Sequence, residues 1–173
     1  TTRATVLRDG AAAEVEQLLG FTNVSRAVLD YLEREHLPKE VVTGTDETLK
    51  AVPWSNELTL AHRPAEVTDQ VSVTTAFACV AETGTVVLLS DPESPTSLNF
   101  VPEHHIVVLR RDRIVPHLED VWSLRRREHP RMPRTINLIT GPSRTGDVEL
   151  HMEVGAHGPR RLNGSGVWRF RPE

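Results

Sequence analysis

The first forty residues are predicted to be helical. Between Asn23 and His36 the apolar positions recur three or four residues apart, which is typical of an amphipathic helix. These positions are Val24, Val28, Leu29 and Leu32. Residues 11–19 are rich in helix-forming residues and predict a further helix. Pro38 cannot continue a helix, so the helical segment ends at about Leu37.

From Glu40 onward, short apolar runs alternate with polar turns, which predicts strands. The predicted strands are Val41-Val42, 71–75, 77–81, 86–89, 106–109 and 136–140. A helix from residue 116 or 117 to about Arg127, with Leu118, Val121, Trp122 and Leu124 on its apolar face, separates the last two. The pattern indicates an α/β protein whose mixed sheet is covered on both faces, with 136–140 as a central buried strand.

Composition narrows the class of protein. The 173 residues, 38% hydrophobic and 25% charged, suit one globular domain. No apolar run approaches the roughly 20 residues that a membrane-spanning helix needs, and no apolar signal region follows residues 1–5, so we expect a cytoplasmic protein without a membrane span. A net charge of −4 provides no general attraction to nucleic acid, which we do not expect as a partner.

The chain has a single cysteine, Cys79, within an apolar run. It can form no internal disulfide and cannot supply the four thiolates that usually hold an iron–sulfur cluster. We therefore expect Cys79 to be a buried core residue, and no iron–sulfur cluster on this chain. Any electron carrier would belong to another protein.

Glu82-Thr83-Gly84-Thr85 follows a predicted strand and is a first candidate site. Glycine permits a tight turn with positive φ, and the threonine hydroxyls can bind a ligand or the turn's own backbone. A partly desolvated Glu82 could serve as a base, a nucleophile or a partner for Arg144. The alternative is a β-hairpin turn in which Glu82 is a solvated or capping acid.

The second candidate site, residues 141–149, follows the apolar run 136–140. Ser143 or Thr145 can cap the next turn, where unpaired backbone N–H groups favour an anion. Arg144 presents a planar fork for a carboxylate or phosphate, and Asp147 could orient it. The alternative is a structural helix cap with Arg144 in an internal ion pair.

His157 and Gly158 lie in a third, glycine-rich segment. His157 could transfer a proton or orient an anion, or it could make a structural hydrogen bond. We expect no metal site, because the eight histidines form no metal-binding spacing, and His104 and His105 would point to opposite faces of a strand.

Two other features have plainer explanations. Arg125, Arg126 and Arg127 would be solvated cations at the C-terminal end of a helix, where they oppose its dipole. Trp54 lies in a loop and could belong to a lid, a partner contact or the edge of the core.

The ETGT, GPSRTGDVE and GAHGP segments, in this order and spacing, resemble those of the LUD-domain family over roughly residues 40–160. The family usually has alanine and isoleucine where this chain has Gly146 and Val148, and its apolar strand after the last motif is not evident here. The resemblance implies a three-layer α/β/α fold with a mixed, largely parallel sheet, of the NagB/RpiA/CoA-transferase-like kind. Residues 1–39 would then be a helical segment packed on a domain of residues 40–173.

The resemblance also implies a function. Lactate-utilization members of the family take part in oxidising L-lactate to pyruvate with iron–sulfur partner proteins. This chain would contribute a site for a small carboxylate or phosphate-bearing ligand, or for a cofactor whose identity stays open, and would not catalyse redox chemistry alone. Glu82 and His157 would be its catalytic residues, and the other site residues would bind the ligand: Thr83, Gly84, Thr85, Ser143, Arg144, Thr145, Asp147 and Gly158.

Two alternatives remain. The chain could be an independent enzyme of the CoA-transferase or cyclo-ligase-like architecture that uses Glu82, or a non-catalytic interaction subunit. We expect the loops after Ala81 and Thr140 to face one cleft, because ligands of open α/β sheets bind where loops leave the carboxyl ends of strands.

Overall fold

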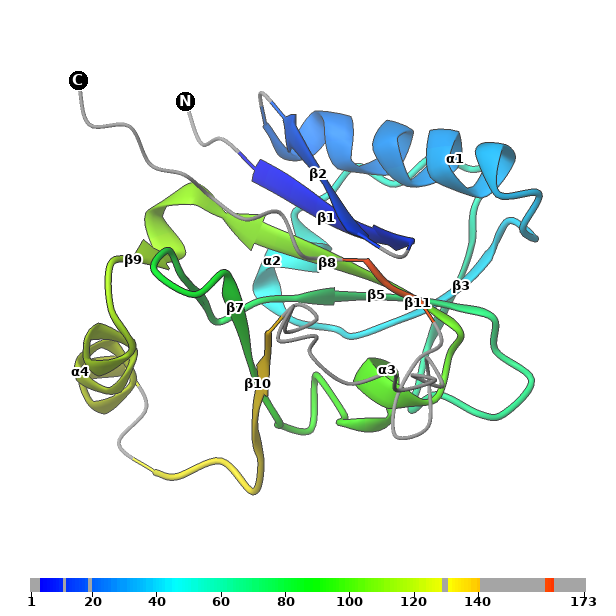
Figure 1. Ribbon diagram of the computed structural model, residues 1–173. Helices are drawn as coiled ribbons and strands as arrows, with labels where there is room; N and C mark the ends of the chain where they lie inside the picture. Colours follow the sequence, from blue (N-terminus) through cyan, green and yellow to red (C-terminus); the bar gives the residue numbers. More distant parts are fainter. Residues whose placement is uncertain (1–3, 11, 19, 129–130, 141–160, 164–173) are drawn as a thin grey trace, which may run out of the picture.

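The computed structural model describes residues 4–10, 12–18, 20–128, 131–140 and 161–163 (Figure 1). The larger of its two sheets has the strand order β2-β1-β8-β5-β3-β4, and β11 pairs with the first part of β8. Its strands are β1 (Ala4–Gly10), β2 (Ala12–Leu18), β3 (Glu40–Thr43), β4 (Thr59–His62), β5 (Val71–Thr75), β8 (His104–Arg110) and β11 (Arg161–Asn163).

The larger sheet is mixed and largely parallel, as predicted. β4, β3, β5 and β8 run parallel to one another, whereas β1 joins β8 and β2 in antiparallel pairs. The chain adds strands in opposite directions from β3: β4 is added on one side of β3, whereas β5 and then β8 are added on the other. A crevice between neighbouring loops is expected at such a reversal.

A four-stranded sheet, in the order β10-β7-β6-β9, forms a second layer. It consists of β6 (Ala78–Val80), β7 (Thr85–Leu89), β9 (Ile114–Val115) and β10 (Ile136–Ile139). β6 and β7 are an antiparallel hairpin, and β10 pairs antiparallel with β7. The α/β class is thus confirmed, and this smaller sheet is an addition that the sequence did not predict.

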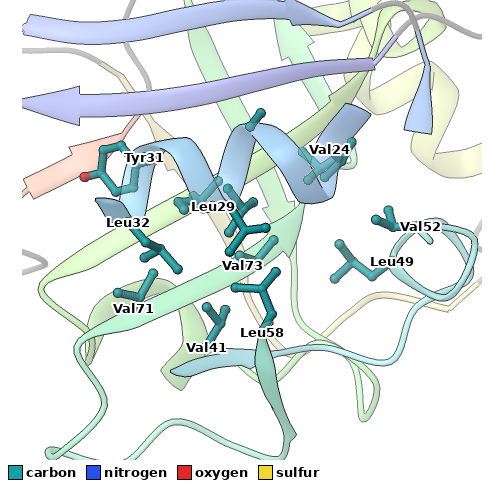
Figure 2. Packing of buried hydrophobic residues seen from close by; sticks show 14 of the residues in the cluster. Val24, Leu29, Tyr31, Leu32, Val41, Leu49, Val52, Leu58, Val71 and Val73 are labelled. Carbon is teal, nitrogen blue, oxygen red and sulfur yellow. The ribbon is translucent and has the colours of Figure 1, made fainter. Parts of the chain in front are cut away.

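The helix α1 (Val24–Arg34) covers one face of the larger sheet and confirms the predicted amphipathic helix. Its apolar face packs on side chains of β3, β5 and β8 in one continuous core (Figure 2). Val28 and Leu32 of α1 and Val73 of β5 are completely buried. Trp54 packs against this core and donates from Nε1 to the Leu49 carbonyl at 3.0 Å, so it belongs to the core edge.

The opposite face of β8 packs on the smaller sheet. Val107 and Leu109 meet Cys79, Val86 and Leu88 there, whereas Ile106 and Val108 face α1. This alternation explains the continuous apolar run in β8, because both faces of the strand are buried. Cys79 is buried as predicted, and desolvation raises the pKa of its thiol to about 11.

The helix α4 (Leu118–Glu128) covers the far face of the smaller sheet, where Val121 packs on Ala78, Val80 and Val87. The expectation of three solvated arginines near its end is wrong for Arg125, which is buried. The remaining short elements are η1 (Phe21–Asn23), α2 (Glu47–Lys50), α3 (Ser97–Phe100) and η2 (Arg111–Arg113). Within the described part of the chain, no helix is both long and apolar enough to cross a bilayer.

Two expectations about individual elements are wrong. Residues 12–18 form strand β2 instead of part of a helix, because all seven pair with β1 in an unbroken antiparallel ladder. The strand predicted at 136–140 is β10, which lies at the end of the smaller sheet and is only partly buried. Its Leu138 side chain is 45% exposed, so it is not a central buried strand.

Candidate functional site

The Glu82-Thr83-Gly84-Thr85 segment forms the turn of the β6–β7 hairpin. Gly84 has a φ of 67°, a left-handed conformation that favours glycine. The turn therefore has the backbone geometry expected from its glycine, in the hairpin form that the sequence left as an alternative.

The strands that precede the two motifs, β6 and β10, end at the same edge of the smaller sheet. β6 and β10 both run antiparallel to the strand between them, β7, so their carboxyl ends lie at one edge. The register places Val80 opposite Thr85 and Ile139 opposite Val86. Thr140, from which residues 141–149 continue, consequently lies beside the ETGT turn.

A chain of three threonine hydroxyl groups joins the ETGT segment to the residue after β10. The Thr83 and Thr85 Oγ1 atoms are 2.6 Å apart, and the Thr85 and Thr140 Oγ1 atoms are 2.8 Å apart. Thr85 is buried, whereas Thr83 and Thr140 are exposed. The buried Thr85 hydroxyl thus connects two exposed hydroxyls, Thr83 and Thr140, which are 57 residues apart in the sequence.

Glu82 projects from this turn into solvent. Its side chain is 62% exposed, and its Oε2 lies 3.0 Å from His117 Nδ1. The hydrogen bond that His117 donates to this carboxylate, together with the negative charge of Glu82, raises the pKa of His117. The expected desolvation of Glu82 is therefore wrong, because the turn lies beyond the last buried residue of β6. His117, as the partner of Glu82, was not predicted.

The other proposed site residues lie outside the residues that the structure describes. They are Ser143, Arg144, Thr145, Asp147, His157 and Gly158. Their roles, and the expectation that Arg144 and Glu82 share one cleft, stay predictions.

The adjacent histidines point to opposite faces of β8, as predicted. His104 Nδ1 lies 2.8 Å from the Tyr31 hydroxyl on the α1 side. His105 is completely buried, and its Nε2 lies 2.7 Å from Thr74 Oγ1. Burial lowers the pKa of His105 to about 3, so this ring is neutral at physiological pH. The described residues hold no group of three or more His, Cys, Asp or Glu side chains that could bind a metal ion.

A cavity of about 160 Å³ lies at the carboxyl ends of β3, β5 and β8. Its lining includes Asp46 after β3, Thr75 at the end of β5 and Arg110 at the end of β8. Phe77 and Leu89, at the open end of the β6–β7 hairpin, line it as well. The cavity is thus at the opposite end of this hairpin from the ETGT turn, and its lining residues were not predicted as a site.

Gly44 allows the loop after β3 to approach the segment after β7. A Cβ at this position would come within 2.6 Å of the Glu93 carbonyl oxygen, to which the Thr45 N–H donates at 2.8 Å. This close approach brings Asp46 and Asp91 into the lining of one cavity. The pattern Thr43-Gly44-Thr45-Asp46 after an apolar strand was the signal available in the sequence.

Comparisons with known proteins identify the family. The LUD domain profile matches residues 26–163. Lactate utilization protein C of Halalkalibacterium halodurans is 30% identical over 162 residues, which cover 81% of this chain and 70% of that protein. Lactate utilization protein C of Geobacillus kaustophilus is 32% identical over 121 residues, covering 62% of this chain and 50% of that protein.

Other relatives carry less specific names. The uncharacterized protein YkgG of Escherichia coli is 40% identical over 93 residues, which cover 52% of this chain and 40% of that protein. The chain therefore spans only about half the length of several relatives that it matches.

A solved structure supports the fold. The crystal structure of a DUF162 family protein from Deinococcus radiodurans superposes with a TM-score of 0.59, at 21% identity, covering 82% of this chain and 80% of that one. This similarity shows the fold, and the profile match over most of the sequence, with the 30% identical relative, shows that the chain belongs to the LUD-domain family.

Proposed function

We propose that this chain is a component of an L-lactate utilization system, in which lactate is oxidised to pyruvate. The relatives named lactate utilization protein C support this assignment. The single, buried cysteine cannot supply four thiolates to an iron–sulfur cluster, so the electrons would pass to iron–sulfur proteins that act with this chain. The isolated chain would not oxidise lactate.

Its own contribution would be a site for a small carboxylate or phosphate-bearing ligand at the two motif turns. The observation that carries this proposal is the 2.8 Å contact between the Thr85 and Thr140 hydroxyls, which joins the ETGT segment to the residue that precedes the GPSRTGDVE segment. Arg144 would hold the anion through its planar fork, with Ser143 and Thr145 supplying further donors. Glu82 and His157 would move protons, and Thr83, Gly84, Asp147 and Gly158 would complete the site.

The exposure of Glu82 weighs against the alternative of an independent enzyme. A carboxylate that acts as a covalent nucleophile is usually shielded from water. Glu82 is instead solvent-exposed and paired with His117. We therefore place the two-turn anion site, in a multi-protein system, ahead of group-transfer chemistry by this chain alone.

The variant Arg144→Lys tests the anion site. It keeps the positive charge but loses the bidentate fork, so ligand affinity is expected to fall by about 1.5–3 kcal/mol, with little change in stability. The measurement pairs lactate-dependent growth of a strain that relies on this gene with the melting temperature of the purified chain. Arg126→Lys, on the exposed side of α4, is the matched control and should leave both unchanged.

Three outcomes would oppose the proposal. Full growth on lactate of an Arg144→Lys variant that is markedly less stable would mean that Arg144 stabilises its loop and does not bind the anion. Turnover of a substrate by the purified chain would favour the independent enzyme. Normal growth after loss of Glu82, Arg144 and His157 together would favour an interaction subunit.

A further inference from the structure

The cavity at the carboxyl ends of β3, β5 and β8 contains groups that the proposed lactate function does not use. It lies where the winding of the larger sheet reverses, between the loops after β3 and β5. Ligands of open α/β sheets characteristically bind at this position. Its volume of about 160 Å³ is close to that of cavities of about 150 Å³ that hold a molecule of six non-hydrogen atoms.

Asp46 is the most distinctive group in this lining. Its Oδ1 accepts hydrogen bonds from the Thr48 and Leu49 N–H groups, at 3.0 and 3.2 Å, and from the Thr75 hydroxyl at 3.0 Å. Its Oδ2 is buried and has no hydrogen-bond partner among the described residues. Desolvation raises the pKa of this carboxyl, and the nearby charge of Asp91 raises it further. An additional donor, and above all a cation, would stabilise the ionised form.

The charges around Asp46 are unevenly balanced. Arg110 is paired with Asp112, with an Nε to Oδ1 distance of 3.0 Å, and Arg113 Nη1 lies 2.5 Å from Glu128 Oε2. In contrast, neither Asp46 nor Asp91 forms an ion pair within the described residues. The cavity therefore has an uncompensated negative side at Asp46 and Asp91.

Arg110 and Arg113 each have N–H groups outside these ion pairs, which can bind a negatively charged group of a ligand. A guanidinium has five N–H donors, and Arg113 uses only Nη1 in its ion pair with Glu128. Because β5 lies between β3 and β8, the loops that carry Asp46 and Arg110 are two strand spacings apart, or roughly 10 Å at the backbone. Side chains that reach inward from both loops leave room for a small molecule with opposite charges at its two ends.

We propose that this cavity binds a small 2-amino carboxylic acid. Its ammonium group contacts the Asp46 and Asp91 carboxylates, its carboxylate contacts the remaining N–H groups of Arg110 and Arg113, and a short apolar side chain packs on Phe77 and Leu89. A 2-hydroxy acid of the same shape fits less well, because a neutral hydroxyl leaves the two carboxylates uncompensated. The site is separate from the motif turns and does not depend on their function.

Calorimetric titration of the 173-residue chain with L-alanine, L-lactate and ethylamine tests the proposal. These probes keep the ammonium and the carboxylate, the carboxylate alone, and the ammonium alone. L-alanine is expected to bind, and each of the others at least about tenfold more weakly to this cavity. Asp46→Asn keeps an oxygen for the N–H donors of Thr48 and Leu49 but removes the charge, so it should weaken L-alanine binding by at least about tenfold. Asp30→Asn, in an exposed pair with Arg26, is the control and should have no effect.

The proposal is overturned if L-alanine does not bind, if Asp46→Asn binds it as tightly as the parent, or if L-lactate or ethylamine displaces it at equal concentration. Should Asp46→Asn fail to fold, Asp91→Asn replaces it. Asp91 Oδ1 accepts from the Glu93 and Ser94 N–H groups, each at 2.7 Å, which an asparagine oxygen can also do. Unchanged L-alanine binding by Asp91→Asn would equally overturn the proposal, and severalfold weaker binding supports it.

Discussion

At the scale of single residues, environment decides the chemistry of otherwise similar groups. His105 and His117 have the same ring, yet the first is completely buried and the second is exposed beside a carboxylate. The pKa is lowered by burial in His105 and raised by the Glu82 hydrogen bond in His117. The sequence predicted that His104 and His105 face opposite ways, because side chains alternate along a strand. It could not predict their pKa values, which depend on neighbours distant in sequence.

His105 is expected to make the protein less stable in mild acid. The unfolded ring takes up a proton below a pKa of about 6.5, whereas the folded ring stays neutral down to about 3, so protonation favours unfolding. The free energy of unfolding should fall by about 1.4 kcal/mol for each pH unit below about 6 from this group. Urea unfolding at several pH values would measure this slope. His105→Gln should have a shallower slope, and an identical slope in both proteins would contradict the prediction.

His117 should respond to removal of its partner. Its raised pKa means that the favourable contact with Glu82 is present below the unfolded pKa and is lost as the pH rises through the folded pKa. In Glu82→Gln, the His117 pKa measured by NMR is expected to fall towards the usual value of about 6.5. The Thr83→Val variant, which leaves the carboxylate in place, serves as the control. Equal His117 pKa values in Glu82→Gln and the parent would show that the pair does not form in solution.

At the scale of elements, strong apolar patterns predicted the structure well and weaker ones did not. The β-branched run 71–75 is β5 with the same bounds, and the helix predicted between Asn23 and His36 is α1. Within the helix predicted at 11–19, residues 12–18 are strand β2, because pairing with β1 outweighed the intrinsic preference of alanine and glutamate for helices. Intrinsic preferences amount to less than about 1 kcal/mol per residue, so a sheet partner can override them.

The threonine chain between β7 and β10 is expected to stabilise the end of the smaller sheet. Thr85→Val keeps the shape of a buried side chain but removes both hydroxyl contacts, so it should lower the free energy of unfolding by about 1–2 kcal/mol. Thr83→Val removes only one contact, at an exposed residue, and should cost less. Urea unfolding of both variants gives the comparison. Equal losses in the two variants would mean that the contact between Thr85 and Thr140 contributes little.

At the scale of the whole molecule, β8 connects both layers. Ile106 and Val108 pack towards α1, and Val107 and Leu109 pack towards the smaller sheet. The sequence predicted the buried strand, but not which layer covers each face. The cavity near Asp46 was not predicted either, because its lining comes from loops far apart in sequence and the pattern at residues 43–46 marks only one of them. The sequence placed each motif after an apolar strand, and these strands, β6 and β10, are the antiparallel neighbours of β7. That the loops after them share one cleft stays a prediction.

Loss of packing between the two layers should destabilise the molecule as a unit. Leu109 is completely buried, so Leu109→Ala is expected to lower the free energy of unfolding by about 2–5 kcal/mol. Leu138, partly exposed on β10, offers the same substitution at the surface, where the change should stay within about 0.5 kcal/mol. Unfolding followed by circular dichroism and by tryptophan fluorescence should give coincident transitions. Separate transitions would show that the two sheets unfold independently.

The three threonine hydroxyls have a directional consequence. Each has one hydrogen and two acceptor lone pairs, so Thr85 donates to at most one neighbour and accepts from the other or from both. An acceptor that takes the Thr140 hydrogen leaves one arrangement that keeps both contacts, in which Thr83 donates to Thr85 and Thr85 donates to Thr140. The Thr83 oxygen then stays an acceptor at the surface. A group that binds at Thr140 can thus set the hydrogen-bonding role of Thr83 without movement of the backbone.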